Sequence, residues 1–188
     1  MSSRIIRPLF AVALLGASSV LVAACSSSSV PAAVRTSAAR PHMSSPSPAA
    51  GVSSSQAAAL AAYRAMWNDV AKASNTADYQ APYLANHLAD SALVTITDNL
   101  AVEHTQGVVA YGAPLLHPLV TSAMPTTVLL SDCLDDHAWL QYFAATNKLV
   151  NDTPGGLRST TVTVSERAGV WKVTQLNTGT DGSCTLGR

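Results

Sequence analysis

The residue best suited to acid–base chemistry is Asp132, which lies on a stretch of strand-forming residues at positions 126–134. Because side chains alternate between the two faces of a strand, Asp132 shares one face with Val128, Leu130 and Leu134. A carboxyl group buried on such an apolar face has a raised pKa, as a general base working near neutral pH requires. The alternative, which we favour, is that Asp132 lies near the end of the strand and caps the turn that follows.

The helical region could contribute three residues to act with Asp132 in catalysis, namely His87, Asp98 and His104. A histidine and a carboxylate form a reasonable acid–base couple, but nothing local indicates that these side chains meet. His87 fits a polar position on a helix, while Asp98 and His104 lie near a helix end, where exposure to solvent is expected. We therefore assign no catalytic residue and keep Asp132, His87 and Asp98 as candidates.

The acidic stretch formed by Asp132, Asp135, Asp136 and His137 is the closest approach to a metal-binding pattern. One strand cannot direct all four side chains at one ion, and the spacing and glycine of a calcium-binding EF-hand loop are absent. The pair Gly155-Gly156 is not followed by the lysine and hydroxyl residue of a phosphate-binding loop. We expect an acidic turn in solvent, no metal and no cofactor.

An N-terminal segment carries the pattern of a bacterial lipoprotein signal. Arg4 and Arg7 precede an uncharged, mostly apolar run that ends in Leu-Val-Ala-Ala-Cys at Cys25. The run is shorter than a membrane-spanning helix needs. We predict that residues 1–24 are removed and that Cys25 carries the acyl chains, such as palmitate, that anchor the protein to the extracytoplasmic face of the cell membrane. The alternative is an ordinary secretory signal cut nearby.

Two further cysteines, Cys133 and Cys184, complete the cysteine content. Outside the cytoplasm two thiols in one small domain usually pair, so we predict a disulfide that ties a central strand to the C-terminal tail. The alternative is two unpaired buried thiols.

Composition divides the mature chain into a tether and one domain. Residues 25–53 are rich in Ser, Ala and Pro and predict a disordered tether. Residues 54–188 hold 7 basic and 11 acidic side chains, a net charge of −4, which argues against nucleic-acid binding. About 135 residues are enough for one domain with one hydrophobic core.

The secondary structure predicted for this domain places helices before strands. Helical spacing of apolar residues and turn residues predict helices at 55–74, 79–88 and 91–103. Segments rich in β-branched residues predict strands at 108–111, 115–122, 126–134, 138–144, 157–166 and 170–176. The order indicates an α+β fold in which N-terminal helices pack on one face of a strongly curved antiparallel sheet.

This domain resembles the NTF2-like superfamily, and more narrowly secreted actinobacterial lipoproteins with a cone-shaped domain of the SnoaL and ketosteroid-isomerase type. The stretches that carry the resemblance are residues 63–67, 127–135 and 169–173. It implies helices that close a cone of bent sheet. Isomerase-like members use a carboxylate base with a Tyr or protonated acid as oxyanion donor, but these positions do not map onto this chain one by one. The superfamily also includes non-enzymatic binding domains, so the fold does not give the function.

The large aromatic residues, among them Trp67, Trp139 and Trp171, are expected to fill the core, and in a cone some of them would line a pocket for a small apolar ligand. We therefore predict a membrane-anchored envelope lipoprotein with a non-catalytic domain that binds a small ligand or an envelope protein, or forms a homodimer. The alternative is an isomerase or cyclase that uses a buried carboxylate.

Overall fold

The computed structural model describes residues 50–152 and 155–187, with side chains from residue 54 onward. The predicted signal peptide, Cys25 and most of the predicted tether lie outside this part. Within it, no helix is both long and apolar enough to cross a membrane. The fold consists of helices and antiparallel sheets, so the predicted α+β class is confirmed.

The first helix, α1 (Ala50–Ser74), begins five residues before its predicted start. Its buried stripe includes Tyr63, Met66, Trp67 and Val70, at the spacing expected for one face of a helix. The predicted helix at 79–88 is much shorter, because α2 spans Leu84–His87 and turns precede it.

The third helix, α3 (Asp90–Gln106), starts after Ala89 and not after a capping Ser91. The hydroxyl of Ser91 donates instead to the carbonyl of Thr174, and the amide of Ala89 donates to the carbonyl of Val173. Contact with a strand therefore sets the start of α3. Its end follows from Gly107, which adopts the left-handed conformation (φ 66°) that terminates many helices.

The strands in the described part of the chain form two separate antiparallel sheets. The larger has the order β2-β3-β6-β7 and contains β2 (Leu119–Met124), β3 (Thr127–Asp135), β6 (Leu157–Arg167) and β7 (Val170–Thr178). The smaller has the order β1-β4-β5 and contains β1 (Val108–Tyr111), β4 (Leu140–Phe143) and β5 (Lys148–Leu149), of which β5 was not predicted. Leu115, which lies outside the named strands, exchanges two backbone hydrogen bonds with Asp135 of β3. Gly112, Pro114 and Pro118 interrupt the chain between β1 and β2, which shortens the predicted strand at 115–122.

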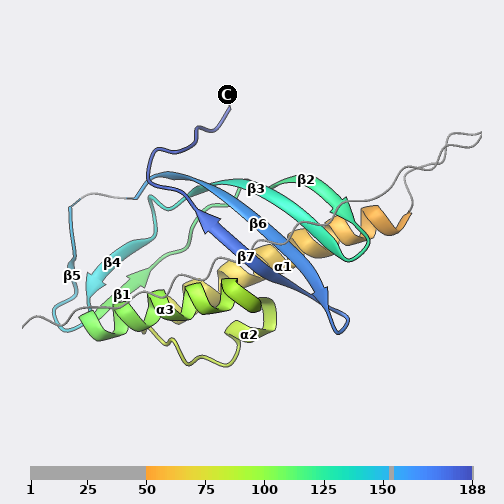
Figure 1. The fold of residues 1–188 in the computed structure, drawn as a ribbon. Coiled ribbons are helices and arrows are strands. Elements are labelled where there is room, and N and C mark those ends of the chain that lie inside the picture. Colours follow the sequence, from red (N-terminus) through yellow and green to blue (C-terminus); the bar gives the residue numbers. More distant parts are fainter. Residues whose placement is uncertain (1–49, 153–154, 188) are drawn as a thin grey trace, which may run out of the picture. The chain divides into compact units, whose positions relative to one another are not determined.

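Helix α1 packs against all four strands of the larger sheet, and α3 packs against β7 (Figure 1). The predicted alternation along β3 is confirmed, because Val128, Leu130, Asp132 and Leu134 are all buried. Val162 and Val164 of β6 pair with Leu130 and Val128 and extend this buried face. Burying an aliphatic side chain of this size contributes about 1.5–3 kcal/mol, so the contact between α1 and the sheet forms the core.

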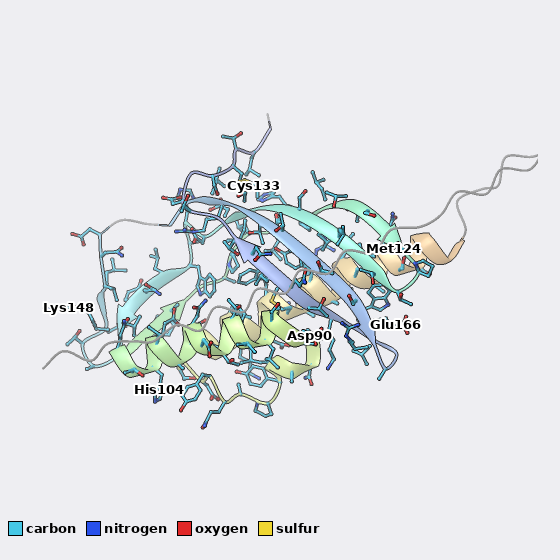
Figure 2. The ribbon with its side chains drawn as sticks, in the orientation of Figure 1. Asp90, His104, Met124, Cys133, Lys148 and Glu166 are labelled. Atoms are coloured by element: carbon cyan, nitrogen blue, oxygen red, sulfur yellow. A yellow bond between two sulfur atoms is a disulfide. The ribbon has the colours of Figure 1, made fainter. Side chains whose placement is uncertain are left out.

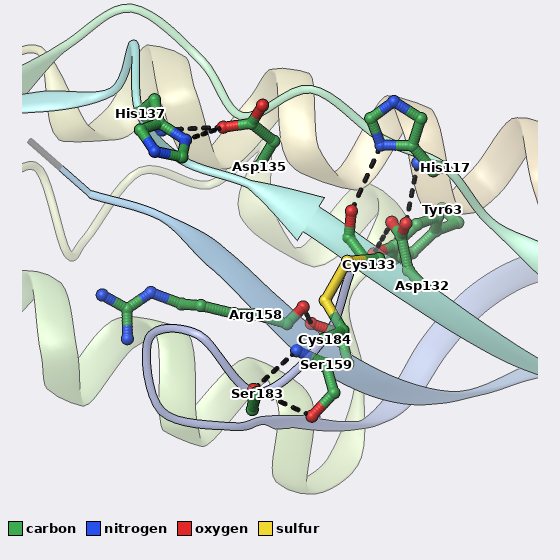
Figure 3. Close-up of a disulfide and its surroundings, with 11 residues drawn as sticks. Tyr63, His117, Asp132, Cys133, Asp135, His137, Arg158, Ser159, Ser183 and Cys184 are labelled. Carbon is green, nitrogen blue, oxygen red and sulfur yellow. Dashed lines mark hydrogen bonds and ion pairs between the residues drawn. A yellow bond between two sulfur atoms is a disulfide. The ribbon is translucent and has the colours of Figure 1, made fainter. Parts of the chain in front are cut away.

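The predicted disulfide between Cys133 and Cys184 is confirmed, with an S–S distance of 2.01 Å. Cys133 lies on β3, an inner strand of the larger sheet, at the end opposite Met124 and Glu166 (Figure 2). Next to the disulfide, the amide of Ser159 donates to the hydroxyl of Ser183 at 2.9 Å (Figure 3). The segment after β7 is thus held against β3 and β6 by a covalent bond and a hydrogen bond.

Candidate functional site

Asp132 lies in the core with 5% of its surface exposed. Its Oδ2 accepts a hydrogen bond from the Tyr63 hydroxyl at 2.8 Å, and its Oδ1 accepts one from the amide of His117 at 2.7 Å (Figure 3). Burial raises the pKa of the Tyr63 hydroxyl well above its usual range, and the negative charge of Asp132 raises it further. Tyr63 therefore stays protonated and acts as a donor at neutral pH.

The favoured prediction that Asp132 caps the following turn is wrong, because Asp135 has that role. Oδ1 of Asp135 accepts from the amide of His137 at 3.0 Å. Asp132 points inward, where its two oxygens connect α1, β3 and the segment before β2. Neither cavity described below is lined by Asp132.

The structure does not bring His87 or Asp98 to Asp132. Nδ1 of His87 lies 2.7 Å from Oδ2 of Asp69, on α1, so the histidine connects α2 to α1. Asp98 is exposed on α3. His104, near the end of α3 away from Asp90 (Figure 2), packs its ring edge-to-face with Tyr79.

The side chains of the acidic turn have separate partners. Asp135 pairs with His137 at 2.6 Å, and Oδ2 of Asp136 accepts from Nε of Arg158 at 2.7 Å. The amide of His137 lowers the pKa of Asp135, and the His137 side chain lowers it further. Among the described residues, no group of three or more His, Cys, Asp or Glu side chains is arranged to hold a metal ion.

A cavity of about 420 Å³ lies where α1 and α3 meet the end of β7. We call it the tryptophan cavity, because Trp67 and Trp139 form part of its wall, edge-to-face with ring centroids 5.7 Å apart. This agrees with the expectation that some of the tryptophans line a pocket. Its remaining lining residues are Val70, Ser74, Thr95, Ile96, Asn99, Leu100, Glu103, Arg158, Leu176, Thr178 and Gly179.

A second cavity of about 350 Å³ shares Glu103, Trp139 and Arg158 with the first. We call it the acidic cavity, because three carboxylates line it. The residues that line it in addition to the shared ones are Ala110, Asp136, Leu140, Gln141, Leu149, Asn151, Gly155 and Asp181. A more apolar compartment thus adjoins a more polar one, and the three shared residues lie where the two meet.

Glu103 is the half-buried carboxyl group at this junction. Its Oε1 accepts from Nε2 of Gln141 at 2.9 Å, whereas its Oε2 is buried with no hydrogen-bond partner among the described residues. Nε1 of Trp139 is likewise buried without an acceptor in the described part of the chain. Burial raises the pKa of Glu103, and the bond from Gln141 offsets part of this shift. Buried polar groups normally have partners, so unpaired ones next to a cavity indicate a place for a ligand.

Neither Glu103 nor Arg158 was among the candidate site residues predicted from the sequence. One signal could have identified Glu103, since it continues the buried stripe of α3 that contains Ile96 and Leu100. An acidic residue on such a stripe is unusual. No comparable signal marked Arg158, because its position depends on the ion pair with Asp136, which follows β3 and lies 22 residues earlier in the chain.

No family model and no curated protein matches this chain. Among solved structures, it is similar to the intermembrane-space region of the chloroplast protein ARC6, with 19% identity, 68% of this chain and 97% of that chain covered, and a TM-score of 0.42. A putative scytalone dehydratase from Novosphingobium aromaticivorans is 11% identical, and the match covers 71% of this chain and 99% of that chain with a TM-score of 0.46. An NTF2-like protein with a cystatin-like fold, also from N. aromaticivorans, is 12% identical, and the match covers 68% of this chain and 86% of that chain with a TM-score of 0.42. These likenesses concern the fold and say nothing of function.

Replacing Tyr63 by Phe should destabilise the domain by about 1–3 kcal/mol, because Oδ2 of Asp132 then remains buried without its donor. The free energy of unfolding in urea, followed by circular dichroism, measures this. Tyr79→Phe is the matched control, since Tyr79 lies at the surface and keeps its ring contact with His104. Equal stability of the two variants would contradict a structural role for the Tyr63–Asp132 bond.

Replacing Glu103 by Gln should stabilise the domain at neutral pH but not in acid. The folded protein holds the Glu103 proton to a higher pH than the unfolded chain does, so this carboxyl group costs stability as the pH rises above its ordinary pKa of 4.5. The gain from Glu103→Gln should therefore appear above that pH and vanish below it, in thermal unfolding over pH 3–8. Glu166→Gln, the same change far from the cavities, is the control. A gain that does not depend on pH would contradict this account of Glu103.

Proposed function

We propose that this protein is a cell-envelope lipoprotein whose domain binds a small molecule in the tryptophan cavity without transforming it. The observation that carries the proposal is the junction of the two cavities. There the Trp139 indole and the Glu103 carboxyl group adjoin the more apolar compartment, and each has a buried polar atom without a hydrogen-bond partner among the described residues. An apolar pocket with a few convergent polar groups is the usual form of a small-molecule site.

The size of the cavity favours a small ligand. Its volume of about 420 Å³ falls in the range of roughly 300–1,000 Å³ typical of small-molecule sites. Apolar contact comes from Val70, Ile96, Leu100 and Leu176. A ligand of this size would displace water from these side chains, which is the main favourable contribution to such binding.

The arrangement of the candidate base supports binding over catalysis. A general base must reach its substrate within hydrogen-bond distance, yet Asp132 accepts from Tyr63 and from the amide of His117 inside the core. His87 is engaged with Asp69, and Asp98 lies on the exposed face of α3. A catalytic set built on these three candidates is therefore not assembled.

The anchor is proposed from the sequence alone. The run Leu-Val-Ala-Ala-Cys at residues 21–25 and the serine- and proline-rich stretch that follows fit acylation at Cys25 and a tether that places the domain outside the cell membrane. The disulfide between Cys133 and Cys184 fits such an oxidising location.

Protein purified from the cells that make it should carry a bound small molecule, detected as added mass by native mass spectrometry. Thr95→Phe should abolish this mass, because Thr95 lines the tryptophan cavity at an exposed position and the larger side chain would obstruct the entrance. Val94→Phe is the matched control, one residue away on α3, exposed and outside the lining. Absence of a bound molecule from the wild type, or its retention in Thr95→Phe, would contradict the proposed site.

Replacing Cys25 by Ser should release the protein from the membrane fraction, since the thiol that accepts the acyl chain is lost. Fractionation with immunodetection measures the distribution. Cys184→Ser provides the comparison, because it also removes a cysteine but leaves Cys25 in place. Membrane association that persists in Cys25→Ser would contradict anchoring at this residue.

A further inference from the structure

We infer that the ligand of the two adjoining cavities is an organic cation, an amine or ammonium group attached to an apolar body. This inference rests on the proposed small-ligand function and specifies its chemistry. The apolar body would lie in the tryptophan cavity, and the charged group would lie at the junction with the acidic cavity.

The charge of the acidic cavity supports a cation. Of the described residues that line it, Glu103, Asp136 and Asp181 are acidic and Arg158 is basic. The ion pair between Arg158 and Asp136, with Nε and Oδ2 2.7 Å apart, compensates one of the three carboxylates. Glu103 and Asp181 then leave a net negative charge, which would repel an anionic ligand and attract a positive one.

Two glycines in the loop before β6 let the carboxylates of Asp136 and Asp181 lie close to the loop backbone. A side chain on Gly155 would overlap the carboxylate of Asp136, and one on Gly156 would overlap the carboxylate of Asp181. The amide of Gly156 also donates to Oδ1 of Asp136. These two glycines therefore allow both carboxylates to approach the loop closely, and the amide of Gly156 and the side chain of Arg158 hold Asp136 in place.

Aromatic surface adjoins the same charge. Trp139 lines both cavities and meets Trp67 edge-to-face, with an interplanar angle of 85°. Indole rings attract cations through the negative potential of their faces, and this attraction is strongest where water is excluded. A positive group at the junction would thus have as neighbours an indole, the Glu103 carboxylate and Arg158, whose charge is paired with Asp136.

A bound cation would change the protonation state of Glu103. Burial raises its pKa, and its Oε2 lacks a hydrogen-bond partner among the described residues. An ammonium group next to Glu103 would favour the ionised carboxylate.

The test uses three probes with similar aromatic bodies and different charges: 2-phenylethylamine, 2-phenylethanol and phenylacetate. Isothermal titration of the purified protein at neutral pH should rank the affinities in that order, with the amine about fivefold to tenfold tighter than the alcohol. Glu103→Gln should lower the affinity for the amine to about that for the alcohol. Asp181→Asn, at an exposed position, should lower it in the same direction, whereas Glu166→Gln should leave it unchanged.

Thr95→Phe distinguishes failure of this inference from failure of the proposed function. If the alcohol or phenylacetate binds as tightly as the amine and Thr95→Phe abolishes that binding, the cavity is a ligand site but the preference for a cation is wrong. The preference is also wrong if Glu103→Gln and Asp181→Asn both leave the amine affinity unchanged. If no probe binds the wild type, the inference is overturned, and native mass spectrometry of the bound molecule decides the proposed function separately.

Discussion

The hydrogen bond between Tyr63 and Asp132 is the constraint on which the arrangement of this domain depends. It is a buried hydrogen bond between side chains that joins α1 to the larger sheet across a mainly apolar interface. Apolar side chains pack in many registers, but a buried carboxylate must find its donors, because leaving it unpaired costs more than most packing differences. The bond therefore fixes where α1 crosses β3, and the second oxygen of Asp132 fixes the segment before β2 through the amide of His117.

The cavities follow from that placement. With α1 fixed on the sheet, Trp67 contacts Trp139, which lies in the loop before β4. Helix α3 adds Ile96, Leu100 and Glu103 to the wall of the tryptophan cavity. The segment after β7 closes the other side, since the disulfide from Cys184 to Cys133 and the bond between Ser183 and Ser159 hold Gly179 and Asp181 near the strands. The walls come from distant parts of the sequence, and each is held by a separate interaction.

The buried carboxyl groups of the domain therefore have two different roles, one structural and one proposed to be functional. Asp132, the acid most suggestive of catalysis in the sequence, has its partners in the core and stabilises the fold. Glu103 has an unpaired oxygen beside a cavity and a raised pKa. The proposed ligand site thus uses a carboxyl group whose hydrogen bonding the fold leaves incomplete, which is where a ligand gains most from binding.

The sequence by itself determined most of the elements and the buried faces of α1 and β3. The period of α1, the alternation along β3, the hairpin between β6 and β7 and the pairing of Cys133 with Cys184 follow from local patterns and from thiol chemistry. Only the tertiary structure decided the partners of Asp132 and His87, the break into two sheets, and the meeting of Glu103, Trp139 and Arg158. The physical reason is that periodicity shows which face of an element is buried, whereas the neighbour that a buried polar group finds there depends on packing between segments far apart in the chain.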